Sequence, residues 1–133
     1  ELSEAGLPLP AHRLVTGDWS ATSGYDGAQA LLAQSPDITA VFAQNDRMAI
    51  GAMRALREAG RRVPADVSII GFDDIPLAGY LDPALTTIQQ DFSVMGRQAA
   101  RRLIGALDQE HLEPTLERIP ATLIVRQSTQ LRA

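Results

Sequence analysis

Residues 41–51, VFAQNDRMAIG, set an apolar run directly against three polar residues and then against a helical pattern. The run 41–43 is typical of a buried strand, and the small residues after Asp46 predict a helix. Aspartate is a favourable helix N-cap, whereas the carboxyl ends of parallel strands are where α/β sheets hold ligands. The stretch therefore predicts one strand–helix unit of a parallel sheet, and it leaves two roles, capping and ligand binding, for Asn45 and Asp46.

The same alternation of short apolar runs with amphipathic stretches extends along the chain, which predicts an α/β fold with a parallel sheet flanked by helices. We expect strands at residues 13–15, 39–43, 67–70, 85–88 and 119–125. We expect helices at residues 20–34, 47–59 and 93–107, with one helical turn at 76–80. Asp46 is the expected N-cap of the second helix, because it stands directly before the helical pattern.

The composition, 133 residues of which 45% are hydrophobic, suits a single globular unit. A net charge of −4 disfavours nucleic-acid binding by this chain itself. The chain has no cysteine, which excludes disulfide and thiolate chemistry and is compatible with a reducing cytoplasm. No run approaches the roughly 20 apolar residues of a membrane helix. The start shows no signal peptide and lacks an initiator Met, which suggests a trimmed fragment.

Pairs of hydrogen-bonding residues follow four of the expected strands: Asp18-Trp19, Asn45-Asp46, Asp73-Asp74 and Gln89-Gln90. Because parallel strands point their carboxyl ends to one edge of a sheet, these side chains should converge on one crevice. They suit a small polyhydroxylated ligand better than an anion, since the chain has neither a Gly-rich phosphate loop nor any Lys. Neighbours on extended backbone face opposite sides, so at most one of Asp73 and Asp74 should enter the crevice. Trp19 fits a core position equally well.

Three segments resemble the lactose-repressor/galactose-repressor (LacI/GalR) family: GDWSATSGYDGAQALL (17–32), AVFAQNDRMAIGAMRALREAGRRVPADVSIIGFDD (40–74) and PALTTIQQDFSVMGRQAARRLI (83–104). They occur in order and at ordinary spacing, and GDWSA and TTIQQDF are similar to the lactose-repressor branch. The resemblance implies a bacterial transcription regulator, usually a repressor. Its effector domain would have the periplasmic-binding-protein type I fold, in which two α/β lobes close over a sugar or related metabolite. For this protein a galactoside-like sugar is expected.

Carried over by motif, the resemblance implies five ligand-binding residues. Trp19 of GDWS would stack on or border the sugar, and Asn45 of QND and Asp73 of GFDD would hydrogen-bond its hydroxyl groups. Gln90 and Phe92 of TIQQDF would line the pocket near the crossover between the lobes. Asp46 would then be left to cap its helix. The resemblance implies no cofactor, and His12 has no metal-ligand partner at useful spacing, so no metal site is expected.

The resemblance also implies how the chain is organised. Residues 1–90 would form the C-terminal lobe of the effector domain. Residues 91–133 would form a crossover tail, with a helix that packs on the first lobe and a strand that returns. The DNA-binding helix-turn-helix headpiece, the hinge and most of the first lobe lie outside this sequence. DNA binding is therefore expected only through residues that this chain lacks.

Homodimerisation is a further expectation from the resemblance, since family members pair side by side about a two-fold axis. They do so through the helix after Asn45, the segment around 76–81 and the start of the helix after Ser20. The apolar side chains expected at such an interface are Ile50, Pro76, Leu77, Tyr80 and Leu81. An isologous interface needs a self-complementary patch, and this one is apolar enough.

Two other functions compete with regulation. A periplasmic sugar-binding protein of an ABC transporter has the same fold, but the LTTIQQ crossover and the LIVRQST ending resemble repressors. A glycosidase could use Asp73 with another carboxylate, yet such chemistry needs two carboxyl groups about 5–10 Å apart, and no convincing second partner is visible. A helix-turn-helix in the full-length protein would indicate a regulator, a signal peptide would indicate a transporter component, and turnover of chromogenic glycosides would indicate an enzyme.

Overall fold

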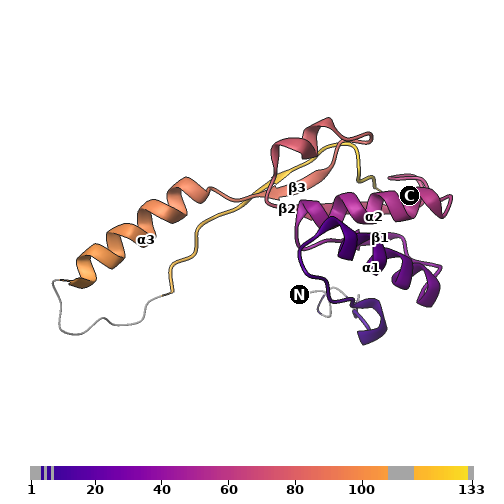
Figure 1. The fold of residues 1–133 in the computed structure, drawn as a ribbon, viewed down its shortest axis with the longest axis horizontal. Coiled ribbons are helices and arrows are strands. Elements are labelled where there is room, and N and C mark those ends of the chain that lie inside the picture. The colour runs from indigo at the N-terminus through magenta and orange to yellow at the C-terminus, as the bar shows by residue number, and fades with distance from the viewer. Residues whose placement is uncertain (1–3, 5, 7, 108–115, 132–133) are drawn as a thin grey trace.

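The computed structural model describes residues 4, 6, 8–107 and 116–131, and Figure 1 shows their arrangement. Along the chain the helices and 3-10 turns are η1 (Ala11–Arg13), α1 (Ala21–Gln34), α2 (Asp46–Glu58), η2 (Pro76–Tyr80) and α3 (Phe92–Leu107). The strands are β1 (Ala40–Phe42), β2 (Ser68–Phe72), β3 (Thr86–Gln89) and β4 (Thr122–Ile124). The alternation of strands and helices predicted from the apolar pattern is confirmed, with boundaries that differ by a few residues.

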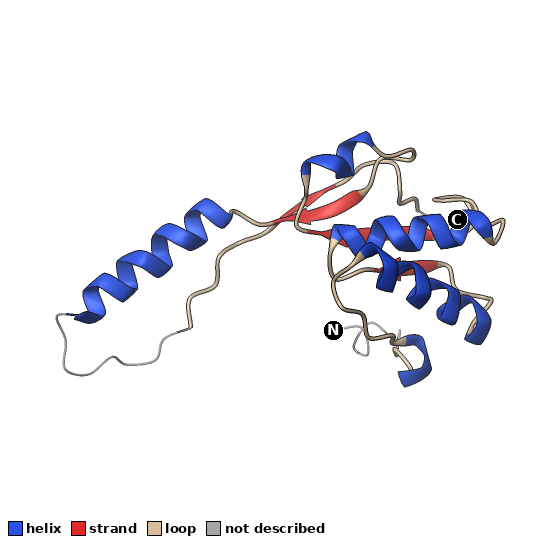
Figure 2. Cartoon of the chain, viewed as in Figure 1, coloured by secondary structure: helices blue, strands red, loops and turns tan. Residues whose placement is uncertain are grey.

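The sheet has the order β1-β2-β3-β4, and Figure 2 shows its strands in red between the helices. β1 pairs with β2 and β2 with β3, both in parallel, whereas β4 runs antiparallel to β3. The expectation of a parallel sheet therefore holds for three strands and is wrong for the fourth. The reason lies in the topology: β4 follows the excursion of α3, and the returning chain meets β3 from the opposite direction.

The predicted strand at residues 13–15 is wrong. Arg13 ends η1, and Leu14 is extended, at φ −110° and ψ 126°, but it belongs to no strand. A salt bridge of 2.9 Å between Arg13 and Asp37 ties the start of this segment to the turn before β1. Strand formation depends on a pairing partner in register, which a segment of three residues cannot reveal.

The core lies where α1, α2 and the sheet meet, and it is built largely from alanine. α2 packs against β2, and α1 packs against α2. Its buried apolar members are Ala28, Ala43, Ala49, Ala52, Ala55, Ile69, Ala78 and Leu85. Small side chains let the two helices approach closely. The approach is tightest at Gly51, where a Cβ atom would lie 1.8 Å from the carbonyl oxygen of Ala21.

Gly51→Ala should therefore destabilise the protein by about 1–3 kcal/mol, because the added methyl group meets backbone that cannot turn away. Gly96→Ala in α3 is the matched control, since nothing lies within 4 Å of the Cβ position there. The control should be neutral or slightly stabilising, because alanine favours a helix by about 1 kcal/mol over glycine. Urea unfolding of both variants measures the difference, and equal midpoints would show that α1 and α2 are not in close contact.

The tail separates from the rest of the fold and then returns. Figure 1 shows α3 standing away from the sheet, and this helix has no buried residue. The chain comes back through β4 to Ser128, which is fully buried. The Ser128 hydroxyl donates to the Ile69 carbonyl at 2.7 Å and accepts from the Thr86 amide at 2.8 Å. The end of the chain is therefore an integral part of the sheet region, whereas α3 does not fold back on it. Within the described residues no helix is long and apolar enough to cross a membrane.

Candidate effector-binding site

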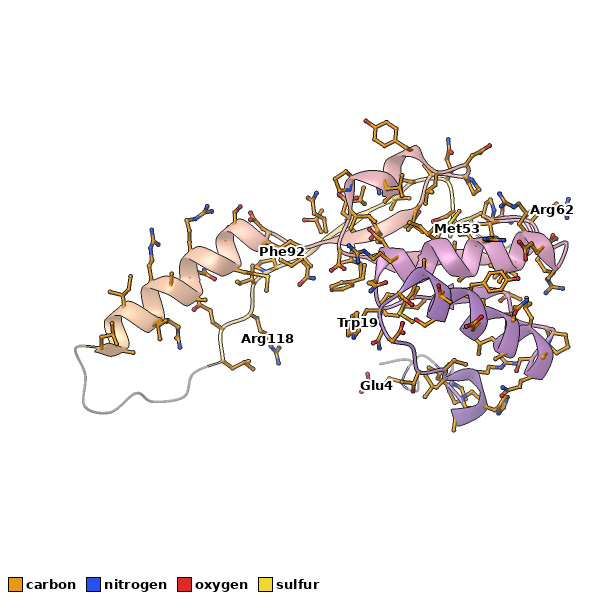
Figure 3. The ribbon with its side chains drawn as sticks, in the orientation of Figure 1. Glu4, Trp19, Met53, Arg62, Phe92 and Arg118 are labelled. Atoms are coloured by element: carbon orange, nitrogen blue, oxygen red, sulfur yellow. The ribbon has the colours of Figure 1, made fainter. Side chains whose placement is uncertain are left out.

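An open hollow of about 440 Å³ lies at the carboxyl ends of the parallel strands. We call it the site hollow. Its lining residues are Trp19, Asn45, Arg47, Asp73, Asp74, Ile75, Pro76 and Phe92. Four of the five ligand-binding residues expected from the sequence thus surround one space, and the fifth, Gln90, donates a hydrogen bond of 3.0 Å to Asp73. Figure 3 shows Trp19 at the end of the sheet region that faces α3, and Phe92 at the start of α3.

Asn45, and not Asp46, is the N-cap of α2. The Asn45 side-chain oxygen accepts from the Met48 amide at 2.7 Å, and its side-chain nitrogen donates to the Trp19 carbonyl at 3.1 Å. The expectation that Asp46 caps the helix is therefore wrong, whereas the expected ligand contact of Asn45 stays a prediction. Asn and Asp cap helices equally well, so their order along the chain could not decide between them. An amide has two N–H donors, and the described contacts use one, so Asn45 can still meet a ligand at the hollow.

Asp46 is instead completely buried behind the site hollow. The Thr87 hydroxyl donates to one carboxylate oxygen at 2.6 Å, and the Ile75 amide donates to the other at 2.8 Å. Burial raises the pKa of Asp46, and these two hydrogen bonds lower it in part. The carboxylate thus joins the start of α2, strand β3 and the turn after β2.

The turn after β2 carries Asp73 and Asp74 in left-handed backbone conformations, with φ of 107° and 53°. Each such non-glycine residue costs about 1–3 kcal/mol, and strain of this kind gathers at binding sites. The premise that both residues are extended was wrong, yet their side chains do diverge. Asp73 meets Gln90, while Asp74 accepts from Arg126 at 2.6 Å and from Gln89 at 2.8 Å. The described contacts occupy both carboxylate oxygens of Asp74 but only one of Asp73. The second oxygen of Asp73 is therefore available to a ligand.

Trp19 is 61% exposed and stands at φ 71°, so the core role that its size allowed is wrong. The turn before it is held by Asp18, whose carboxylate accepts from the Ser20 amide at 3.0 Å and from the Ser20 hydroxyl. The Asp18 amide in turn donates to the Ser23 hydroxyl at 3.1 Å. Ser20 also caps α1 by accepting from the Ser23 amide. This short network presents the indole ring at the edge of the site hollow.

The hydroxyl groups of Ser20 and Ser23 and the Ser20 amide lower the pKa of Asp18 from 3.8 to about 2. A carboxylate with a lowered pKa stabilises the fold above pH 3.8 and loses that contribution as the pH falls through about 2. We therefore expect the Asp18 carboxyl carbon to titrate in an NMR experiment with a midpoint near 2. Ser20→Ala should move the midpoint upward, and an unperturbed midpoint in the unmodified protein would show that the turn is not formed.

A second and larger hollow, of about 1080 Å³, runs along the free edge of β1. It is bounded by the unpaired segment 13–17, by α1 and by β1, and Phe42 of β1 is 56% exposed beside it. Its lining brings together none of the strand-end carboxylates, so it is a weaker candidate than the site hollow for a hydroxylated ligand.

Two arginines near the site were not expected from the sequence. Arg47 lines the site hollow from the first turn of α2, and Arg126 holds Asp74 after β4. The sequence carries no local signal for either role, because Arg126 lies 52 residues from Asp74 along the chain. Among the described residues no group of three or more potential metal ligands comes together.

The family model of a periplasmic binding protein-like domain matches residues 1–129. The chain belongs to this family. Its relatives include the HTH-type transcriptional regulator CelR of Thermobifida fusca, which is 38% identical over 127 residues, or 96% of this chain and 37% of that protein. The resemblance to LacI-family regulators is confirmed. The chain spans 37% of the length of the curated relatives that it matches.

Solved structures agree with this membership. A complex of the transcriptional regulator CelR with cellobiose has a TM-score of 0.88 at 38% identity, covering 96% of this chain and 39% of that one. The lac repressor dimer bound to operator and the anti-inducer ONPF has a TM-score of 0.85 at 37% identity, covering 96% of this chain and 44% of that one. The fold is therefore that of part of the effector-binding domain of LacI-family regulators.

Proposed function

We propose that this chain is part of a sugar-responsive transcriptional regulator of the LacI family, and that the site hollow binds the sugar. Residues 1–90 are its C-terminal lobe, and residues 91–133 are the tail that crosses to a first lobe. The observation that carries the proposal is the convergence of Trp19, Asn45, Asp73 and Phe92 on one hollow, with Gln90 bonded to Asp73. These residues come from four places in the sequence, and the fold joins them.

The chemistry of this hollow supports a neutral, hydroxylated ligand. The free oxygen of the Asp73 carboxylate accepts hydrogen bonds from hydroxyl groups, and the remaining Asn45 N–H donates one. The exposed ring faces of Trp19 and Phe92, 61% and 58% exposed, suit the apolar C–H side of a sugar ring. A cellobiose complex of a similar regulator supports the same ligand class.

Regulation fits the observations better than transport or catalysis. The similar protein CelR is a transcriptional regulator, and the lac repressor neighbour is bound to operator. A cytoplasmic location follows for a protein that meets DNA through its headpiece. A glycosidase would need a second free carboxylate beside Asp73, but Asp74 is held by Arg126 and Asp46 is buried. The whole protein is therefore proposed to be a regulator and not an enzyme.

Dimerisation about α2 and η2 is part of the proposal. Leu77 and Tyr80 of η2 are 51% and 87% exposed, although both are large and apolar. Ile50 is half-buried on α2, and Pro76 is exposed. Leu81 is less available, because it packs against the core. Large exposed apolar side chains gathered on one element are typical of an interface.

Calorimetric titration of the full-length protein with a panel of mono- and disaccharides tests the proposed function. We expect one saccharide to bind at micromolar concentration, and the 133-residue chain alone to bind it at least about tenfold more weakly, because the first lobe supplies the other wall. Full-length protein that binds none of the panel would contradict the assignment of a sugar. Equal affinity of the short chain would contradict the two-lobed site.

A further inference from the structure

The buried carboxylate of Asp46 has no place in the ligand contacts proposed above, yet it lies directly behind them. It is fully buried, it starts α2, and it adjoins Asn45, which caps that helix and lines the site hollow. A Cβ atom on Gly71 of β2 would come within 2.2 Å of its Oδ1 atom. The glycine of the GFDD motif thus leaves room for this carboxylate, which reaches across the end of β2.

The two groups that Asp46 binds enclose the turn carrying Asp73. The Ile75 amide, which donates to Asp46 at 2.8 Å, is the first backbone donor after the turn. The Thr87 hydroxyl, which donates to Asp46 at 2.6 Å, lies beside the turn, and the Asp74 amide donates to the same hydroxyl at 3.4 Å. A further hydrogen bond fixes the turn to β3, where the Ile88 carbonyl accepts from the Asp73 amide at 2.8 Å.

These hydrogen bonds are needed because the backbone of the turn is strained. Asp73 and Asp74 both hold positive φ angles, which L-residues adopt only where surrounding contacts fix them. Two of the contacts that fix this turn pass through the Asp46–Thr87 pair. Without them the backbone is free to relax, and the Asp73 carboxylate would leave the position from which it meets Gln90.

We propose that Asp46 is a positioning residue for the effector: with Thr87 it holds the strained turn so that the Asp73 carboxylate faces the site hollow. Asp46 does not touch the ligand and acts through Asp73. This inference rests on the proposed function of the same site. Burial raises the pKa of Asp46, because removing the carboxylate from water disfavours its charged form. An apolar side chain at this position would avoid that desolvation cost. A local cost of this kind is characteristic of residues that serve a site.

The test uses the full-length protein and the saccharide found by the panel titration. Asp46→Ala removes both hydrogen bonds, and Thr87→Val removes the hydroxyl while keeping the shape of the side chain. We expect each variant to weaken saccharide affinity about tenfold, because the Asp73 contact is displaced. Ser128→Ala is the matched control. It also removes a fully buried side-chain group with two hydrogen bonds between β2 and β3, but at the end away from the turn.

Ser128→Ala should lower the free energy of unfolding as Asp46→Ala does, but its saccharide affinity should stay within about twofold of that of the unmodified protein. A double-mutant cycle then separates positioning from a general loss of order. In an Asp73→Asn background, Asp46→Ala should weaken binding by less than about threefold, because the group through which it acts is already impaired.

Each outcome decides the inference. Unchanged saccharide affinity in folded Asp46→Ala or Thr87→Val protein would overturn it. A full tenfold loss of affinity on adding Asp46→Ala to the Asp73→Asn background would overturn it as well. So would a loss of affinity in Ser128→Ala equal to that in Asp46→Ala. If Asp46→Ala does not fold, the affinity of Thr87→Val decides alone. Failure of the unmodified protein to bind any saccharide would remove the proposed function and this inference with it. Normal binding by the unmodified protein together with unaffected variants would remove only the inference.

Discussion

Asp73→Asn in the full-length protein is expected to weaken saccharide binding by about 10–100-fold, which makes it the most damaging single change in the site. One Asp73 oxygen accepts from Gln90, and the other is left for a ligand hydroxyl. A hydrogen bond to a charged group is worth about 1.5–3 kcal/mol, and the amide replaces both the charge and one acceptor. Isothermal titration calorimetry measures the change.

Asp26→Asn is the control for this prediction, because it makes the same change on the exposed side of α1. The control should bind as the unmodified protein does. Unchanged affinity in Asp73→Asn would mean that the ligand does not meet this carboxylate, and the assignment of the site would have to move to other residues of the hollow.

Ile50→Asp should convert the proposed dimer of the full-length protein into monomers at micromolar concentration. A carboxylate placed in an apolar interface cannot find a partner there, so we expect the dimer dissociation constant to rise more than about 100-fold. Ile50 is half-buried on α2, close in sequence to the cap at Asn45. Sedimentation equilibrium measures the mass, and circular dichroism checks that α2 is intact.

Ala33→Asp serves as control for the dimer, because Ala33 is exposed near the end of α1 and away from η2. This variant should remain dimeric. Dimers that persist in Ile50→Asp would remove the α2 face from the interface and leave the exposed Leu77 and Tyr80 without an explanation.

The sequence predicted the fold well where apolar periodicity was strong. The amphipathic pattern of α2 and the apolar run of β2 are local properties, and both elements occur where expected. It failed at residues 13–15, because strand formation depends on a pairing partner elsewhere in the chain. It failed also at β4, whose direction depends on the path of the chain through α3. Both failures concern contacts between distant residues.

At the site, too, local sequence features were predictable and contacts between distant residues were not. The polar pairs after the strands indicated which residues would meet, because parallel topology gathers strand ends at one edge. The sequence could not show how the roles are divided within a pair. Asn45 took the capping role expected of Asp46, and Asp46 became a buried acceptor. The deciding partners, Met48 for Asn45 and Thr87 and Ile75 for Asp46, are set by the folded chain. The pairing of Asp74 with Arg126 could not be predicted for the same reason.

The central claim, that a sugar held at this hollow regulates DNA binding, is tested most directly by fluorescence anisotropy. DNA selected by the full-length protein from a random pool would be titrated with and without the saccharide that binds it. We predict that the saccharide changes the DNA affinity at least about fivefold and that Asp73→Asn abolishes the response while leaving saccharide-free DNA binding intact. A saccharide that binds with no effect on DNA affinity, or a response that survives in Asp73→Asn, would contradict the claim.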